Sequence, residues 1–427
     1  MVTSAQDVLR RLGDDGIERI DLKVTDLAGR WQSISLEAHH FGEGAFLHGL
    51  ALDGLLLHPD PATAWIDPFL SPRSLSLIAA VEGPPDGAGR LRHCPRTLAT
   101  RALALLAGSG LADAARFGTE SGYFLFQELT SRADDLGCGC RVAPGGAIPE
   151  ALHSELGLTL AALGIRARLP LQRAAGPLQH LTLASDDPLR AADALMVSRY
   201  VVRNVARRHG WSATFLPRPS LDATCAGLAV HQSLWRVGHP LFAGEGTYGE
   251  LSQTARWYLG GLLRHGPSLA AFTNPGTNSY RRLGSGPQAP SRLAYARHDS
   301  ATVVAIPEPD GDPGRRRLVL RQADGLANPY LAFSAILLAG LDGVRHQIDP
   351  GPPADREPAH RPGDQPAALP ADLGAALAAL AADHDYLLVG DVFSRELLDD
   401  WIALKHSDVE ALEQRPHPLE FVGEASA

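Results

Sequence analysis

The chain has 427 residues, with 39 basic and 48 acidic side chains, which gives a net charge of −9 when histidine is neutral. This length can bury a large core and predicts two or three domains. The acidic balance argues against a nucleic-acid-binding protein, because phosphate backbones are bound by surfaces with a basic excess. We expect no membrane association, since no run of about 18 apolar residues is present. The N-terminus lacks the apolar segment of a secretory signal, and the four cysteines are too few for a disulfide framework, so we expect a cytoplasmic protein.

The first part of the chain has the pattern of a small sheet. Apolar and polar residues alternate over 17–36 around a glycine turn, which predicts a β-hairpin. A short helix is expected before it, over 5–12, and a third strand over 74–83. From Pro95 the apolar residues take helical spacing. We therefore predict a sheet domain over residues 1–94.

Strands and helices alternate over the rest of the chain, which we expect to form one larger domain over residues 95–427. A segment rich in proline and charge, 349–372, predicts an exposed loop, because such a composition cannot form a core. The predicted fold class is α+β, with the strands of the larger domain covered by helices. The main expected strands cover 116–126 and 178–184, and the main expected helices cover 148–164, 188–210, 246–266 and 327–344.

Segments spread over nearly the whole chain match one known family. They include DLAGRWQSISL (26–36), FTNPGTNSYRRLGSGPQAPSRLAYA (272–296) and RRRLVLRQADGLANPYLAFSAILLAGLDGV (315–344). In these segments the chain resembles glutamine synthetase of the bacterial type I family. The resemblance implies a β-grasp-like N-terminal domain and a catalytic domain with a curved antiparallel sheet covered by helices. It also implies a homo-oligomer, a hexameric ring or a dodecamer, with active sites between neighbouring subunits.

The resemblance further implies a metal-dependent reaction, in which glutamate is phosphorylated by ATP and ammonia then displaces the phosphate. The family holds Mg²⁺ or Mn²⁺ on carboxylates and one histidine, and such hard ions require oxygen ligands. Here one of the matching positions keeps a carboxylate, Glu120. We therefore predict that the chain lacks glutamine synthetase activity and uses neither a metal ion nor ATP. The other matching positions hold Gly122, Leu171, Gln179, Ala229 and Val319.

Several residues on the substrate side of the resemblance remain. Arg282 matches the arginine that binds the substrate carboxylate, and an arginine pairs well with such a group, although pairing with a neighbouring subunit is the alternative. Arg317 and Arg321 lie on one face of a strand and could hold an anion. Cys225 lies in a changed substrate-binding turn, and a buried filler is its alternative role. Gln288 replaces a flap glutamate. These five form the predicted substrate-binding set.

Glu120 and His231 are the predicted catalytic pair, because a carboxylate and an imidazole can exchange protons near neutral pH. A structural histidine, and a carboxylate that merely pairs with an arginine, are the alternatives. Two short motifs lack partners at metal-ligand spacing and are interpreted as incidental: Cys138-x-Cys140, which we expect in a loop, and His39-His40, which we expect at the end of a strand.

Three functions remain open at this point. The first is a repurposed enzyme that acts on a small amino-acid-like or amide ligand in the former glutamate pocket. The second is a pseudoenzyme that serves as a scaffold or regulatory subunit. The third is an ATP-dependent carboxylate–amine ligase, for which the shortened loop at Asp53 would admit a bulkier amine. The missing metal ligands place the third behind the first two.

Overall fold

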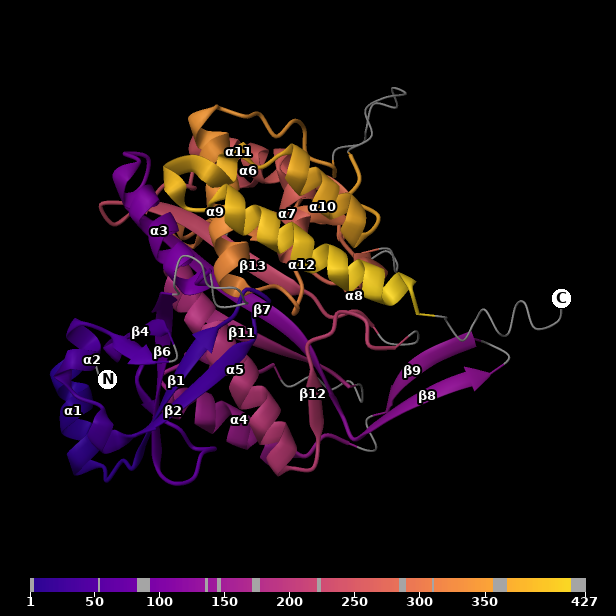
Figure 1. Cartoon of the computed structure of the whole chain (residues 1–427). Helices are drawn as coiled ribbons and strands as arrows, with labels where there is room; N and C mark the ends of the chain where they lie inside the picture. Colours follow the sequence, from indigo (N-terminus) through magenta and orange to yellow (C-terminus); the bar gives the residue numbers. More distant parts are fainter. Residues whose placement is uncertain are drawn as a thin grey trace.

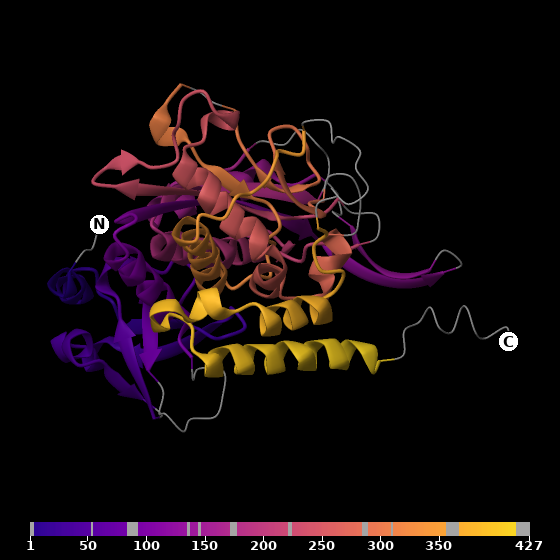
Figure 2. The same cartoon turned by 90° about the horizontal axis from the view of Figure 1, so that it is seen from above.

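The computed structural model describes residues 4–52, 54–82, 93–134, 137–143, 147–170, 177–220, 224–283, 289–308, 311–355 and 367–415. The described chain forms a six-stranded sheet near the N-terminus, a nine-stranded sheet in the larger remaining part, and a separate two-stranded hairpin. Figures 1 and 2 show the N-terminal sheet at one end of the molecule and the hairpin projecting at the other end.

The N-terminal sheet has the strand order β2-β1-β6-β4-β3, with β5 pairing with β6. The predicted hairpin is confirmed: β1 and β2 pair antiparallel, and the turn between them contains Gly29 with a φ of 80°. The predicted third strand is β6, which lies parallel to β1. The elements are α1 (Ala5–Asp14), β1 (Arg19–Thr25), β2 (Trp31–Glu37), a 3-10 turn (Ala38–His40), α2 (Glu43–Leu47), β3 (Leu50–Leu52), β4 (Leu55–Pro59), β5 (Trp65–Ile66) and β6 (Ser74–Glu82).

This sheet has a hydrophobic cluster of its own. Its members include Val8 of α1 together with Ile20, Leu22, Leu75 and Leu77 of the central strands, all of them fully buried. Three other residues of this part of the chain belong instead to the main core, so the two cores adjoin. The domain division after residue 94 stays a prediction. The three are Leu27, Trp65 and Ile78.

The large sheet has the strand order β10-β11-β7-β13-β17-β16-β15, with β12 pairing with β7 and β14 with β13. Its described neighbours pair antiparallel, except β15 and β16, which are parallel. The long central strands β7 and β13 therefore carry most of its face. The bounds are β7 (Ala114–Phe126), β10 (Ala167–Arg168), β11 (Leu178–Asp186), β12 (Ser212–Thr214), β13 (Leu228–Arg236), β14 (His239–Pro240), β15 (Arg292–Ala296), β16 (Thr302–Ala305) and β17 (Leu318–Leu320).

Helices pack beside this sheet, and several begin at a side chain that caps them. Asp187 accepts a hydrogen bond from the Arg190 amide at the start of α5, and Asn328 does the same for Tyr330 at the start of α9. The helices α10 and α12 lie side by side in Figure 2. The bounds are α3 (Pro95–Gly108), α4 (Glu150–Ala162), α5 (Pro188–Arg208), α6 (Gln253–Arg264), α7 (Gly266–Thr273), α8 (Thr277–Leu283), α9 (Pro329–Arg345), α10 (Leu373–Ala382), α11 (Asp385–Leu388) and α12 (Arg395–Glu413).

Two expectations of secondary structure are wrong. The helix expected from residue 246 begins only at Gln253, because Ser252 caps it and Gly249 takes a left-handed conformation with a φ of 62°. The Cys138-x-Cys140 motif was expected in a loop but lies in β9 (Gly137–Ala143), which pairs with β8 (Glu128–Asp134) in the projecting hairpin.

A membrane-spanning helix was not expected, and among the described residues no single helix is long and apolar enough to span a bilayer. One bent pair, Leu373–Ala382 with Asp385–Asp391, passes the same test of length and composition when the two are taken together. The first helix of this pair buries Leu373, Ala376, Leu377 and Leu380.

The tight turn between β13 and β14 contains a strained residue. Val237 and Gly238 both have positive φ, 50° and 75°, and Val237 is 78% exposed. A β-branched side chain is poorly suited to this conformation, whereas asparagine tolerates it. Val237→Asn is therefore expected to raise the free energy of unfolding by about 1 kcal/mol, measured by urea denaturation. Val237→Ala should raise the free energy of unfolding by less, because alanine does not tolerate a positive φ as asparagine does. A Val237→Asn chain less stable than the wild type would contradict the explanation.

A buried histidine joins four helices. His265, between α6 and α7, lies 2.9 Å from an oxygen of Asp342 on α9 and 2.8 Å from one of Asp383, which follows α10. Because both ring nitrogens face carboxylates, the ring is held as an imidazolium ion. Burial lowers the pKa of His265, but the two carboxylates outweigh burial and the net shift is upward. The Tyr386 ring stacks on His265 at 4.0 Å.

This arrangement predicts a loss of stability in alkaline solution. A group whose pKa is raised by folding stabilises the fold fully below its unfolded pKa, about 6.5 for histidine, and the effect is lost as the pH rises through the folded pKa. The difference in thermal midpoint between the wild type and His265→Gln should therefore shrink by a few degrees as the pH is raised from 6 to 9. A difference that stays constant with pH would show that His265 is not held as the cation.

Candidate active site

One face of the large sheet brings the predicted catalytic residues together. In antiparallel strands, residues directly opposite one another point to the same face. Glu120 on β7 is opposite Ala229 on β13, and His231, two residues further along β13, is opposite Val319 on β17. The alternate residues of these strands, such as Val230, point into the core and are buried. Glu120 and His231 therefore share the accessible face of the sheet.

A chain of contacts links three of the predicted residues. The Nε2 atom of His231 lies 3.1 Å from an oxygen of Glu120, at an angle that does not make a straight hydrogen bond. On the other side of the ring, Nε of Arg317 donates a hydrogen bond to Nδ1 of His231 at 2.9 Å. Arg317 also donates to the backbone oxygen of Arg315 at 3.1 Å. Glu120, His231 and Arg317 thus form a connected row from one strand to the next.

The arginine determines the tautomer of the histidine. Arginine has no acceptor atom, so Nδ1 of His231 must be unprotonated to receive the hydrogen bond from Arg317. In this arrangement the ring is neutral and carries its proton on Nε2, which is the atom that faces Glu120. The protonated nitrogen of His231 therefore lies beside the Glu120 carboxylate and is available to donate to a bound molecule.

Glu120 is a half-exposed carboxylate in a cationic environment. Its contact with His231 is the largest cause of a lowered pKa, with smaller contributions from Arg168 and Arg317 in the same direction, while burial opposes them. Glu120 is therefore ionised near neutral pH. An ionised carboxylate with 46% of its side chain exposed can accept a proton from a bound molecule.

The structure corrects one assignment made from the sequence. Gln179 was matched to one of the family's metal-ligand positions. It is opposite Tyr123, however, and lies buried on the face of the sheet that does not carry Glu120. His180 is opposite Gly122 and Thr182 is opposite Glu120, so His180 and Thr182 lie on the face of the candidate site. Burial lowers the pKa of His180, with the negative charge of Glu120 acting in the opposite direction.

A turn fills the space above Gly122. A side chain added at Gly122 would meet Ala226 Cβ at 3.0 Å, which is tighter than nearly all real contacts. The backbone amide of Gly122 also donates to the oxygen of Gly227 at 2.9 Å. Cys225 lies at the start of this turn and is half-buried. The turn therefore packs directly against the position where a second carboxylate was expected.

Arg282 points into the protein. Its guanidinium donates to the backbone oxygens of Gln322 at 2.7 Å, Ala323 at 3.1 Å and Arg321 at 2.8 Å. Burial lowers its pKa, and the buried Asp324 acts in the opposite direction. A side chain on Gly227 would meet its Nη2 at 2.5 Å, so the missing side chain makes room for it. These contacts brace the end of β17, and binding of a substrate carboxylate by Arg282 stays a prediction.

The remaining predicted residues are divided between the site and its surroundings. Arg321 follows β17, and its Nη1 atom lies 3.4 Å from the oxygen of Asp299, within hydrogen-bond reach. Gln288 lies outside the described residues, as do Leu171 and Asp53. His180 and Arg168 were not among the site residues predicted from the sequence. His180 could have been found from the alternation of side chains along β11, because Thr182 is paired with Glu120 and His180 lies two residues before Thr182 on the same face.

The described residues of this face do not fit a hard divalent ion. On β7, β13 and β17 the face carries one carboxylate, Glu120, beside Gly122, Ala229 and Val319. Magnesium-like ions need several oxygen ligands in nearly octahedral array. A single carboxylate that is already in contact with an imidazole does not supply them.

Comparison with known proteins identifies the family. Residues 92–423 match the family model described as glutamine synthetase, catalytic domain. The chain is 37% identical to a glutamine synthetase of Frankia alni, with 99% of each chain aligned. It is also 37% identical to a 3-hydroxylaminophenol mutase of Cupriavidus pinatubonensis, again with 99% of each chain aligned.

The fold is compared most directly with a solved structure. The glutamine synthetase of Plasmodium falciparum, determined by cryo-electron microscopy, aligns with a TM-score of 0.88 over 99% of this chain and 98% of that chain. The two sequences are 18% identical, so this likeness concerns the fold alone.

Proposed function

This chain belongs to the glutamine synthetase family and has its fold, and we propose that it has lost metal-dependent phosphoryl transfer and catalyses proton transfer on a small amino-acid-like substrate. The observation that carries the proposal is the row formed by Glu120, His231 and Arg317. It provides an ionised acceptor, an oriented imidazole and a fixed cation on the accessible face of the sheet. No step of the proposed reaction requires a metal ion or ATP.

The loss of phosphoryl transfer is supported by the residues at the expected ligand positions. Phosphoryl transfer is mainly positioning and charge stabilisation, which metal ions and cationic side chains provide. Gly122, Ala229 and Val319 offer no ligand atoms in their side chains, and Ala226 fills the space beside Gly122. Restoring the site would require the turn at 224–227 to move as well as new carboxylates.

The proposed roles follow from the contacts. Glu120 accepts a proton from the substrate, because it is ionised and half-exposed. His231 donates its Nε2 proton toward Glu120 or toward the substrate and keeps the carboxylate in place. Arg317 is a positioning residue, since it acts through the tautomer of His231. The nearby cation Arg168 favours a substrate with a carboxylate or another anionic group.

Repurposing of this fold is supported by the relatives. One protein as similar to this chain as the glutamine synthetase of Frankia alni carries the name 3-hydroxylaminophenol mutase. A mutase rearranges its substrate without joining two molecules, so a rearrangement is compatible with the row of Glu120, His231 and Arg317. The substrate of this chain is proposed as amino-acid-like, and 3-hydroxylaminophenol is a reasonable test compound.

The proposal is tested by binding and turnover in the absence of metal and ATP. The purified chain is treated with chelator and screened by ligand-observed NMR against amino acids, their amides and 3-hydroxylaminophenol. We expect at least one saturable ligand that is converted by the wild type and not by Glu120→Gln. Arg317→Met should retain binding and slow turnover, whereas Arg315→Met, which keeps the backbone oxygen that accepts from Arg317, should behave as the wild type. Turnover that requires ATP would instead support the carboxylate–amine ligase.

A pseudoenzyme is the second candidate, and the inward orientation of Arg282 favours it. Arg282 was matched to the arginine that binds the substrate carboxylate, but its guanidinium donates hydrogen bonds to three backbone oxygens of this chain. If the screen finds no ligand and the Glu120→Gln chain behaves as the wild type in every assay, a scaffold or regulatory role becomes the better account.

A homo-oligomer, as a hexameric ring or a dodecamer, and a cytoplasmic location are parts of the same proposal. Both rest on the resemblance of this chain to the family. Sedimentation-equilibrium analysis of the purified chain tests the first. A monomer of 45.4 kDa at micromolar concentration would contradict it.

A further inference from the structure

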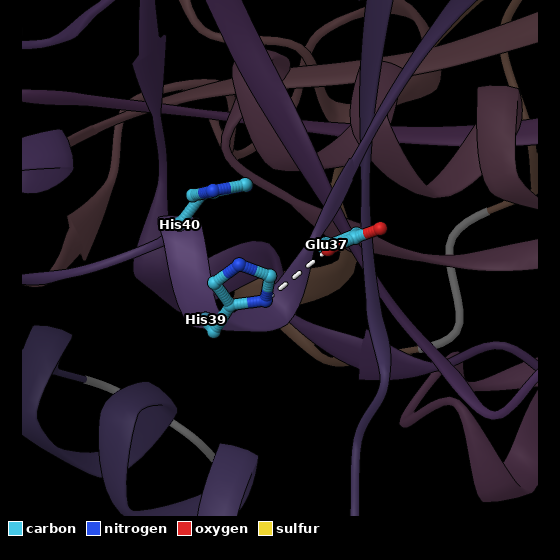
Figure 3. Close-up of side chains that lie close together, drawn as sticks. All are labelled: Glu37, His39 and His40. Carbon is cyan, nitrogen blue, oxygen red and sulfur yellow. Dashed lines mark ion pairs between the residues drawn. The ribbon is translucent and has the colours of Figure 1, made fainter.

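A group of possible metal ligands lies on the N-terminal sheet, on a different sheet from Glu120. Glu37 ends β2, and His39 and His40 form the 3-10 turn that follows. Figure 3 shows the His39 ring turned toward Glu37, with the His40 ring above it in this view. One ligand atom of each residue lies within 4.8 Å of the others, and among the described residues this is the one group of three or more with that property.

The three side chains are close to a coordinating arrangement. Nδ1 of His39 lies 3.3 Å from an oxygen of Glu37, and the rings of His39 and His40 are 3.9 Å apart between centroids. In a tetrahedral zinc site with bonds of about 2.0–2.2 Å, ligand atoms lie roughly 3.3–3.6 Å from one another. Because these side chains are exposed, small rotations can bring their ligand atoms to that spacing.

The backbone beneath the group is already held. The amide of Ala38 donates to the oxygen of Glu18 at 2.9 Å, and the amide of Phe41 donates to the oxygen of Ala38 at 3.1 Å. The Phe41 side chain is buried and packs edge-on against Phe46. Binding an ion would therefore order side chains only, which keeps the entropic cost low.

We propose that Glu37, His39 and His40 bind a divalent transition-metal ion of the zinc class, with a fourth position open to water or an external ligand. Two imidazoles and one carboxylate are a donor set that suits Zn²⁺ and does not suit Mg²⁺ or Ca²⁺, which prefer oxygen. The His39-His40 pair was interpreted as incidental because its spacing offers no partner. Glu37, brought alongside by the end of β2, supplies one.

The group formed by Glu37, His39 and His40 is independent of the proposed reaction.

One neighbouring cation affects the strength of binding at this group. Arg19 on β1 is paired in register with Glu37 on β2. A cation at that position opposes binding of a second cation. The exposed side chains and the single carboxylate predict affinity weaker than that of closed structural zinc sites, which have four protein ligands.

The test is a calorimetric titration of the full chain with Zn²⁺ in a non-chelating buffer. We expect one saturable site in the wild type and at least tenfold weaker binding in His39→Ala/His40→Ala. The matched control is His48→Ala/His406→Ala, which removes two exposed histidines elsewhere and should bind as the wild type does. Arg19→Gln should tighten binding, because it removes the opposing charge.

A second readout separates coordination from nonspecific binding. Co²⁺ in place of Zn²⁺ should give the visible absorption of a tetrahedral ion in the wild type and in the control, and not in His39→Ala/His40→Ala. Circular dichroism checks that the variants are folded. Equal zinc affinity in the wild type and in His39→Ala/His40→Ala, or no zinc binding by the wild type below millimolar concentration, would overturn the proposal.

Discussion

Replacing Arg96 by methionine is expected to lower the free energy of unfolding by about 3–5 kcal/mol, because the change leaves a buried carboxylate without its cation. Arg96, in the first turn of α3, donates two hydrogen bonds to Asp193 on α5, at 3.0 and 2.9 Å. It donates a third to Asp60 at 2.6 Å. Tyr330 on α9 donates to the same Asp193 at 2.7 Å. One arginine thus ties the N-terminal part of the chain to two core helices.

The measurement is urea denaturation of the wild type, Arg96→Met and Arg96→Met/Asp193→Leu. The double variant removes both members of the buried pair and should recover much of the loss, since an apolar replacement of a whole pair is close to neutral. Asp60 is more exposed and can be hydrated in both variants. A loss below about 1 kcal/mol in Arg96→Met would show that water reaches Asp193.

Replacing His231 by asparagine is expected to slow the proposed reaction by about 10²–10⁴-fold, the usual contribution of a positioned acid–base group. The measurement is steady-state turnover of the compound found in the metal-free screen. His239→Asn, an exposed histidine on β14, is the matched control and should keep wild-type turnover. A His231→Asn chain within twofold of the wild type would remove His231 from the mechanism.

The pH profile distinguishes catalysis from a structural role. Glu120 must be ionised to accept a proton, and contact with His231 is the largest cause of its lowered pKa. Activity of the wild type should therefore fall only at a pH below the ordinary titration range of a glutamate carboxyl, because the pKa of Glu120 is lowered. Removing His231 removes that cause, so the acidic limb of the residual activity should move to higher pH. A purely structural histidine would not shift this limb.

The fold could be predicted from local patterns where those patterns have a single physical meaning. The glycine turn at Gly29 and the alternation around it give the first hairpin, and Asp187 followed by proline gives the start of α5. The start of α6 could not be placed in this way, because the residues before Ser252 are compatible with a helix by composition. The left-handed conformations of Gly249 and Glu250 and the cap at Ser252 exclude one.

The candidate site was predictable in its members but not in its contacts. Glu120, His231 and Arg317 follow from motif positions, whereas the order of contacts among them depends on strand register. The pairing of β11 with β7 also places His180, and not Gln179, on the face that carries Glu120. The two residues are adjacent in the sequence, and a difference of one residue puts a side chain on the opposite face of the sheet. The inward orientation of Arg282 depends on Gly227 and on the carbonyl oxygens of residues 321–323, which follow β17 and lie far from Arg282 in the sequence, so no local pattern reveals it.

The central claim is that this member of the glutamine synthetase family does not bind ATP through a metal cluster. The most direct test is a calorimetric titration of the His39→Ala/His40→Ala chain with ATP in the presence of Mn²⁺, so that the surface group cannot contribute heat. We predict no saturable binding of ATP with or without Mn²⁺. Tight ATP binding that depends on Mn²⁺ would contradict the account and restore the ATP-dependent ligase as the leading function.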